Sequence, residues 1–98
     1  MYSMDNLLTL VSSEQARELR FRADAPPIIV MDDEPHALEG PPITAENVER
    51  LLRSIATSRE MRELRVHGVV EFIYHFQRTS PFLVHARMRD GTVSFDVE

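Results

Sequence analysis

Three residues in the last part of the chain are of the types that form hydrolytic sites: His85, Ser94 and Asp96. Alternating apolar residues predict that the two segments pair as antiparallel strands, which places His85 directly opposite Asp96. A histidine beside a carboxylate forms part of many catalytic triads. Ser94, however, would lie diagonal to this pair, on an open sheet face without donors for an oxyanion. We therefore favour a cross-strand polar pair over a catalytic unit and predict no catalytic residue.

A second group of side chains could bind a hard cation. The carboxylates of Asp32, Asp33 and Glu34 precede His36, and carboxylate oxygens are the ligands that such cations prefer. Their spacing matches no EF-hand loop, and the tract lies where two strands need a turn, so acidic turn residues are the favoured interpretation. The chain has no cysteine, and its histidines are scattered, with His67 in an expected loop. We predict no metal site and no cofactor.

The composition indicates one globular domain spanning residues 1–98. Of the residues, 43% are hydrophobic, and the net charge is −5. A negative charge argues against nucleic acid or an anionic membrane as the partner. No apolar run approaches the ~20 residues that span a bilayer, and the first residues lack the basic region of a signal peptide. We expect a cytoplasmic protein with no direct membrane insertion.

The first half of the chain predicts a helix followed by short strands. An apolar stripe predicts a helix over 5–13 with Ser3 as its N-cap. Alternation over 18–23 predicts a half-buried strand, which Pro26-Pro27 must end because proline removes a ladder donor. An apolar strand over Ile28–Met31 and a short third strand over roughly 36–39 should follow.

The middle of the chain predicts two helices. Thr44 is the expected N-cap of the first, which carries apolar residues at helical spacing. Thr57 and Glu60 fit a capping box that opens a shorter helix through Leu64. The surfaces of both helices are rich in arginine and glutamate, with pairs such as Glu46–Arg50 in the favourable i,i+4 order. A solvated surface is the default interpretation, and a recruitment surface is the alternative.

The last third predicts a three-stranded antiparallel meander. Asp90-Gly91 is a strong signal for a two-residue hairpin turn. It would pair Met88 with Val93, Ala86 with Phe95 and Val84 with Val97. A turn over 77–81 would pair Phe76 with Phe82, Tyr74 with Val84, Phe72 with Ala86 and Val70 with Met88. Both registers place these apolar residues on one face of the sheet, and helices over that face would complete a two-layer α/β sandwich.

The opposite face of the meander is the predicted interaction face. Its expected rows are Glu71–Arg87–Ser94, Ile73–His85–Asp96 and His75–Leu83–Glu98. The polar rows are interrupted by Ile73, Leu83 and Val69, so this face could be solvated or could receive a partner. The candidate residues are Glu71, Ile73, His75, Leu83, His85, Arg87, Ser94 and Asp96.

Several motifs, in this order, resemble the N-terminal domain of the type IV pilus retraction ATPases (PilT-like) and their type II secretion relatives. Residues 17–21, before Pro26-Pro27, stand where family members carry a motif like S-D-L-H-L before a Pro-Pro turn. Asp32-Asp33 stands in place of Asp-Gly, 71–74 in place of D-F-S-Y, and 81–87 in place of R-F-R-V-N-V-F. The resemblance implies a PAS-like α/β domain. In the family this domain packs against ATPase domains of a hexamer.

The resemblance does not extend to nucleotide chemistry. In the family a P-loop ATPase domain follows, whereas this sequence contains no G-x-x-x-x-G-K-[ST] motif. The family's nucleotide-sensing arginines correspond here to Pro81, Leu83, Met88 and Asp90, with Arg87 and Arg89 nearby but shifted by one place. We therefore predict that the chain is not an ATPase.

Two functions follow from the residues and the resemblance. The first is a non-catalytic protein-interaction module for assembly or regulation, whose partner is a pilus or secretion ATPase or a second copy of the chain in a homodimer. The second is a PAS-like small-molecule sensor, with Phe72, Tyr74, Phe82 and Phe95 lining a pocket between sheet and helices. The same aromatic residues are needed as core in so short a chain, which favours the first.

Overall fold

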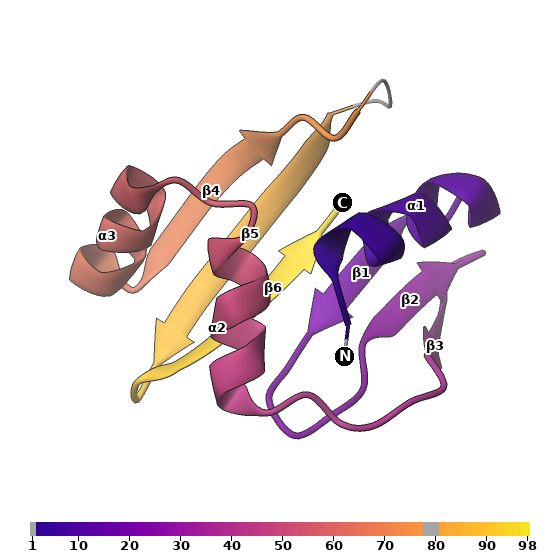
Figure 1. Cartoon of the computed structure of the whole chain (residues 1–98), viewed down its shortest axis with the longest axis horizontal. Helices are drawn as coiled ribbons and strands as arrows, with labels where there is room; N and C mark the ends of the chain where they lie inside the picture. The colour runs from indigo at the N-terminus through magenta and orange to yellow at the C-terminus, as the bar shows by residue number, and fades with distance from the viewer. Residues whose placement is uncertain (1, 78–80) are drawn as a thin grey trace.

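The computed structural model describes residues 2–77 and 81–98, which form a mixed α/β domain (Figure 1). Three helices and six strands occur within these residues. In chain order they are α1 (Met4–Glu14), β1 (Glu18–Phe21), β2 (Ile28–Met31), β3 (Glu34–Ala37), α2 (Ala45–Arg53), α3 (Ser58–His67), β4 (Val69–Tyr74), β5 (Phe82–Arg89) and β6 (Thr92–Val97).

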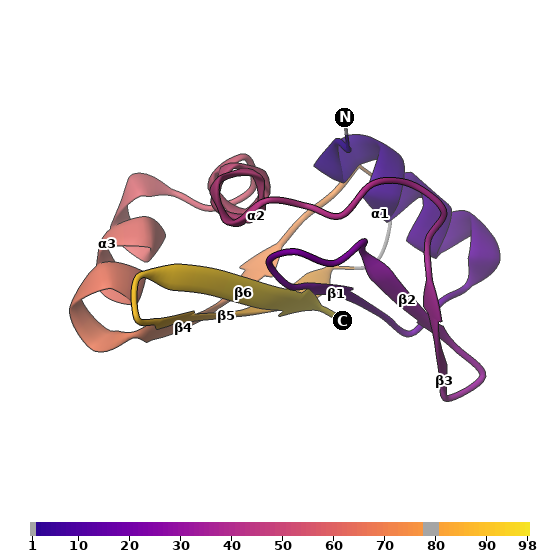
Figure 2. The same cartoon turned by 90° about the horizontal axis from the view of Figure 1, so that it is seen from below.

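The six strands form one sheet with the order β3-β2-β1-β6-β5-β4, and every neighbouring pair is antiparallel. Figure 2 shows α1 and α2 over one face of this sheet and α3 at its β4 end. The predicted two-layer α/β fold with an antiparallel C-terminal meander is therefore confirmed. The strands β4 and β3 form the two edges of the sheet.

Side-chain caps begin all three helices where the sequence predicts them. Ser3 Oγ accepts from the Asn6 N–H at 3.2 Å, and Thr44 caps α2 in the same way. Thr57 and Glu60 form the predicted capping box of α3. This helix continues to His67, beyond the expected end at Leu64. It ends there because Gly68 adopts the left-handed conformation of a C-cap, at φ 80°.

The first strands differ from the prediction at their ends. β1 ends at Phe21, two residues before the expected end. Asp32 and Asp33 both adopt positive φ, 51° and 63°, and make a two-residue turn, so the third strand begins at Glu34 and not at residue 36. The predicted third strand began only after Pro35. In the structure Pro35 lies on the edge strand β3, where it pairs with Val30 of β2 and where its missing N–H is tolerated.

One of the two predicted registers in the meander is correct and the other is wrong by two residues. Asp90 and Gly91 have positive φ, 53° and 76°, and the three β5–β6 pairs predicted from this turn are all present. Between β4 and β5 the structure pairs Tyr74 with Phe82, where the prediction had Val84. The other predicted β4–β5 pairs are wrong by the same two positions, and those facing Val70 and Phe72 are Ala86 and Val84. The predicted turn over 77–81 includes residues 78–80, which lie outside the described residues.

The core lies between the sheet and the helices. A single cluster of buried side chains runs from α1 through the sheet to α2 and α3, and it includes Phe72, Phe82 and Phe95, with Tyr74 packed against it. Phe95 is fully buried, and Phe72 and Phe82 are buried. The four aromatic residues considered for a ligand pocket therefore pack as core. The sheet face away from the helices is left to polar side chains and a few apolar ones.

Candidate functional site

The face of the sheet that the helices leave uncovered, which we call the outer face, carries the predicted interaction residues except His75. His75 follows the end of β4 at Tyr74. In the structure Ile73 is opposite Leu83 and Glu71 is opposite His85, so the predicted rows are wrong by two residues on β4 and correct between β5 and β6. The predicted residues still share one face of the sheet, because a slip of two residues leaves each side chain on the same side.

A row of polar and charged side chains crosses four strands of the outer face. Arg20, Asp96, His85 and Glu71 are successive cross-strand neighbours from β1 to β4. His85 Nε2 lies 2.9 Å from Glu71 Oε2. This contact links β5 to the edge strand β4.

Asp96 is bound by arginines and not by His85. Arg22 Nη1 donates to Asp96 Oδ1 at 2.8 Å, and Arg87 Nη2 lies 3.6 Å from Asp96 Oδ2. The predicted backbone opposition of His85 and Asp96 is confirmed. Their side chains nevertheless have different partners, Glu71 for His85 and the two arginines for Asp96, so the His85–Asp96 pair considered for a catalytic unit is not formed.

Arg20, at the β1 end of this row, also donates from Nε to Oε1 of Glu18 on the same strand, at 2.9 Å. This hydrogen bond, with the charge of Glu18, raises the pKa of the Arg20 guanidinium above its usual value. Glu18 and Arg20 thus form an ion pair along the outer face of β1.

At the β4 edge the outer face is apolar. The side chains of Val69 and Ile73 are 59% and 53% exposed, on either side of Glu71 in sequence. The two residues are four positions apart and therefore on the same face of the strand, and exposed apolar patches often mark contact surfaces. Leu83, opposite Ile73, extends this patch.

One side of the β4 main chain has no strand partner within residues 2–77 and 81–98. Leu83 and Glu98 exchange both main-chain hydrogen bonds, at 2.9 and 2.8 Å, and Met88 donates to the Gly68 carbonyl at 2.9 Å. Odd-numbered residues of β5 therefore bond to β6 and even-numbered ones to β4, because antiparallel ladders alternate. It follows that Val69, Glu71 and Ile73 direct their N–H and C=O groups to the open edge. Such an edge is a template for another strand.

The acidic tract between β2 and β3 has a structural role in this fold. Asp32 and Asp33 form the turn, and Asp33 accepts a hydrogen bond from Arg17. His36 Nε2 lies 4.0 Å from Glu34 Oε2. Within residues 2–77 and 81–98, no three His, Asp or Glu side chains are grouped so that they could hold a metal ion.

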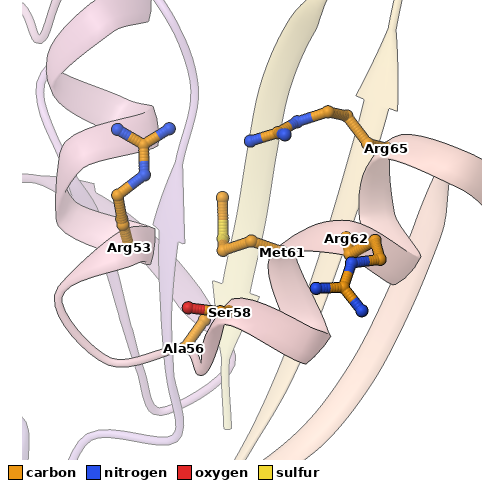
Figure 3. A pocket seen from close by; sticks show the side chains of 6 residues that line it. All are labelled: Arg53, Ala56, Ser58, Met61, Arg62 and Arg65. Carbon is orange, nitrogen blue, oxygen red and sulfur yellow. The ribbon is translucent and has the colours of Figure 1, made fainter.

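A hollow between α2 and α3 was not predicted from the sequence. It has a volume of about 380 Å3. Figure 3 shows the side chains of Arg53 and Arg65 on either side of Met61. The sequence did contain a signal, because Arg62 and Arg65 have no acidic residue three or four positions away. The lining residues are Arg53, Ala56, Ser58, Met61, Arg62 and Arg65.

The fold is shared with a pilus retraction motor and with the ATPase DotB. No protein-family model matches the sequence, and no curated protein is significantly similar to it. Among solved structures, the pilus retraction motor PilT with bound ADP is similar at a TM-score of 0.89 and 19% identity, over 100% of this chain. The ATPase DotB of Legionella pneumophila is similar at 0.81 and 14% identity over 99% of this chain. DotB of Yersinia pseudotuberculosis is similar at 0.72 and 12% identity over 95%.

This chain spans about 29% of the length of PilT and of the Legionella protein, and 28% of the Yersinia one. Its fold is thus that of one part of these ATPases, consistent with the N-terminal domain that the sequence motifs predicted. At these identities the similarity defines the fold alone.

In the described residues, no helix is both long and apolar enough to cross a membrane.

Proposed function

We propose that this domain is a non-catalytic protein-interaction module, for assembly or regulation, related to the ATPases of type IV pili or type II secretion. The observation that carries the proposal is the exposure of Val69 and Ile73 on β4, whose outward main-chain groups have no strand partner among the described residues. An added strand would satisfy those groups while its side chains cover the two hydrophobic residues.

The partner that best fits the fold is an ATPase of the same kind. In such a protein a domain of this fold is one part of a longer chain, and this domain would dock against a surface of that chain through its outer face. A charged row with both signs, from Arg20 to Glu71, would fix the orientation of the contact, since complementary charges set register and specificity more than affinity.

The test is light scattering on a size-exclusion column, with the chain alone and with a full-length pilus retraction ATPase. We expect a stable complex. Ile73→Asp should weaken it by about tenfold or more, because it places a charge in the centre of the apolar contact. Val66→Asp is the matched control, because Val66 is 69% exposed but lies on α3.

A chain that remains monomeric and ignores the ATPase would contradict the proposal. A dimer of the chain alone that Ile73→Asp dissociates would keep the interaction surface but assign it to a second copy. Circular dichroism of each variant separates loss of binding from loss of folding.

A further inference from the structure

We propose that the hollow between α2 and α3 is a binding site for the phosphate group of a small organic phosphate ester. The inference is independent of the interaction surface, because the residues that line the hollow lie on α2, on α3 and between them, and not on the outer face of the sheet. The hollow has a volume of about 380 Å3, which is within the range of small-molecule sites, about 300–1,000 Å3.

The first line of support is an imbalance of charge on these two helices. Together they carry five arginines and four glutamates in a chain whose net charge is −5. Each glutamate has a partner. Glu46 pairs with Arg50, Glu49 with Arg53 and Glu63 with Arg59, while Glu60 accepts from the Thr57 N–H.

Arg62 and Arg65 are left over. Within the described part of the chain, no carboxylate lies within ion-pair distance of either side chain. The two are three positions apart on one helix, where like charges destabilise the helix slightly. An anion bound to Arg65 would offset that repulsion with an attraction of its own.

The geometry of the hollow brings two guanidinium groups to one space from two helices. Figure 3 shows Arg53 of α2 and Arg65 of α3 facing each other across Met61. Arg53 pairs with Glu49, but a guanidinium has five N–H donors, so it keeps donors for a second acceptor. Two such groups match the tetrahedral oxygens of a phosphate through charge-assisted hydrogen bonds.

The floor of the hollow favours an ester over a bare ion. Met61, which is buried, and Ala56 provide apolar surface, and Ser58 at the start of α3 provides a hydroxyl. An organic group next to the phosphate would lie against Ala56 and the part of Met61 that lines the hollow, and a thioether contacts aromatic rings favourably. The ligand class is therefore a phosphate monoester with an apolar or aromatic group.

The test is an NMR titration of the intact chain that follows the arginine Nε–Hε signals and backbone amides. The probes are phenyl phosphate and inorganic phosphate, at low ionic strength. We expect saturable shifts at Arg53, Ser58 and Arg65, with phenyl phosphate binding more tightly than inorganic phosphate. Arg65→Gln should weaken binding by about tenfold or more, since it removes a charge-assisted contact.

Arg59→Gln is the matched control, because Arg59 is on the same helix but is not part of the hollow and already pairs with Glu63. Equal weakening by both variants would show attraction to general positive charge and would overturn the site. Absence of saturable shifts would do the same. Equal binding of the two probes would support a phosphate site and overturn the inference about the organic group.

Discussion

The rings of Phe21 and Phe95 stack with their centroids 4.3 Å apart and their planes at 15°. The two residues are cross-strand partners on β1 and β6, and both side chains are fully buried. This pair joins the strands β1, β2 and β3 to the C-terminal meander, because β1 and β6 are adjacent in the centre of the sheet.

We expect Phe95→Ala to lower the free energy of unfolding by about 3–5 kcal/mol, because it removes a buried ring and leaves a cavity. This is a large share of the ~5–15 kcal/mol typical of a small domain. Urea unfolding followed by circular dichroism measures the loss. Phe95→Leu keeps most of the volume and should cost clearly less, and equal losses for the two variants would contradict the packing role of the ring.

How far the fold could be predicted is illustrated by the two registers of the meander. Asp90-Gly91 forms a two-residue turn, and a turn of fixed length sets the pairing of the strands that flank it. The longer connection between Tyr74 and Phe82 contains no such signal, so apolar alternation gave the correct face but left the register free by two residues.

The candidate site was predictable in its position but not in its contacts. The Asp90-Gly91 turn, together with alternation along β5 and β6, was enough to place His85 and Asp96 side by side on the outer face. That Asp96 binds Arg22 could not be predicted, because it depends on β1 inserting next to β6, a pairing of segments 74 residues apart. Whether the face binds a partner is a prediction that the fold does not test.

We expect Thr57→Ala to lower the free energy of unfolding by about 1 kcal/mol, because it leaves the Glu60 N–H without its acceptor and opens the capping box. Thermal unfolding by calorimetry measures the difference. Ser58→Ala, at the adjacent position, removes a hydroxyl that is not the N-cap of the helix, so it should change the free energy of unfolding little. A larger effect at Ser58 than at Thr57 would mean that the cap does not stabilise α3.

Asp96→Asn should lower the free energy of unfolding by about 1 kcal/mol, because a charge-assisted hydrogen bond becomes a neutral one. The Asp96 side chain is only 15% exposed, and it accepts from Arg22 at 2.8 Å. Glu63→Gln is the control, since its pair with Arg59 spans 3.7 Å and is largely exposed, and such pairs contribute about 0–1 kcal/mol. Equal effects in urea would show that the Arg22–Asp96 bond adds nothing beyond a surface pair.

Hydrogen exchange along β4 tests the open edge directly. The ladder predicts that the amides of Val70, Phe72 and Tyr74 are bonded to β5 and exchange slowly, whereas those of Val69, Glu71 and Ile73 point to solvent and exchange fast. An amide-resolved NMR measurement should show this alternation in the free chain. If a partner adds a strand here, the fast amides become protected on binding while the slow ones change little. Uniform protection along β4 in the free chain would mean that the edge is already covered, and it would remove the structural basis for the proposed contact.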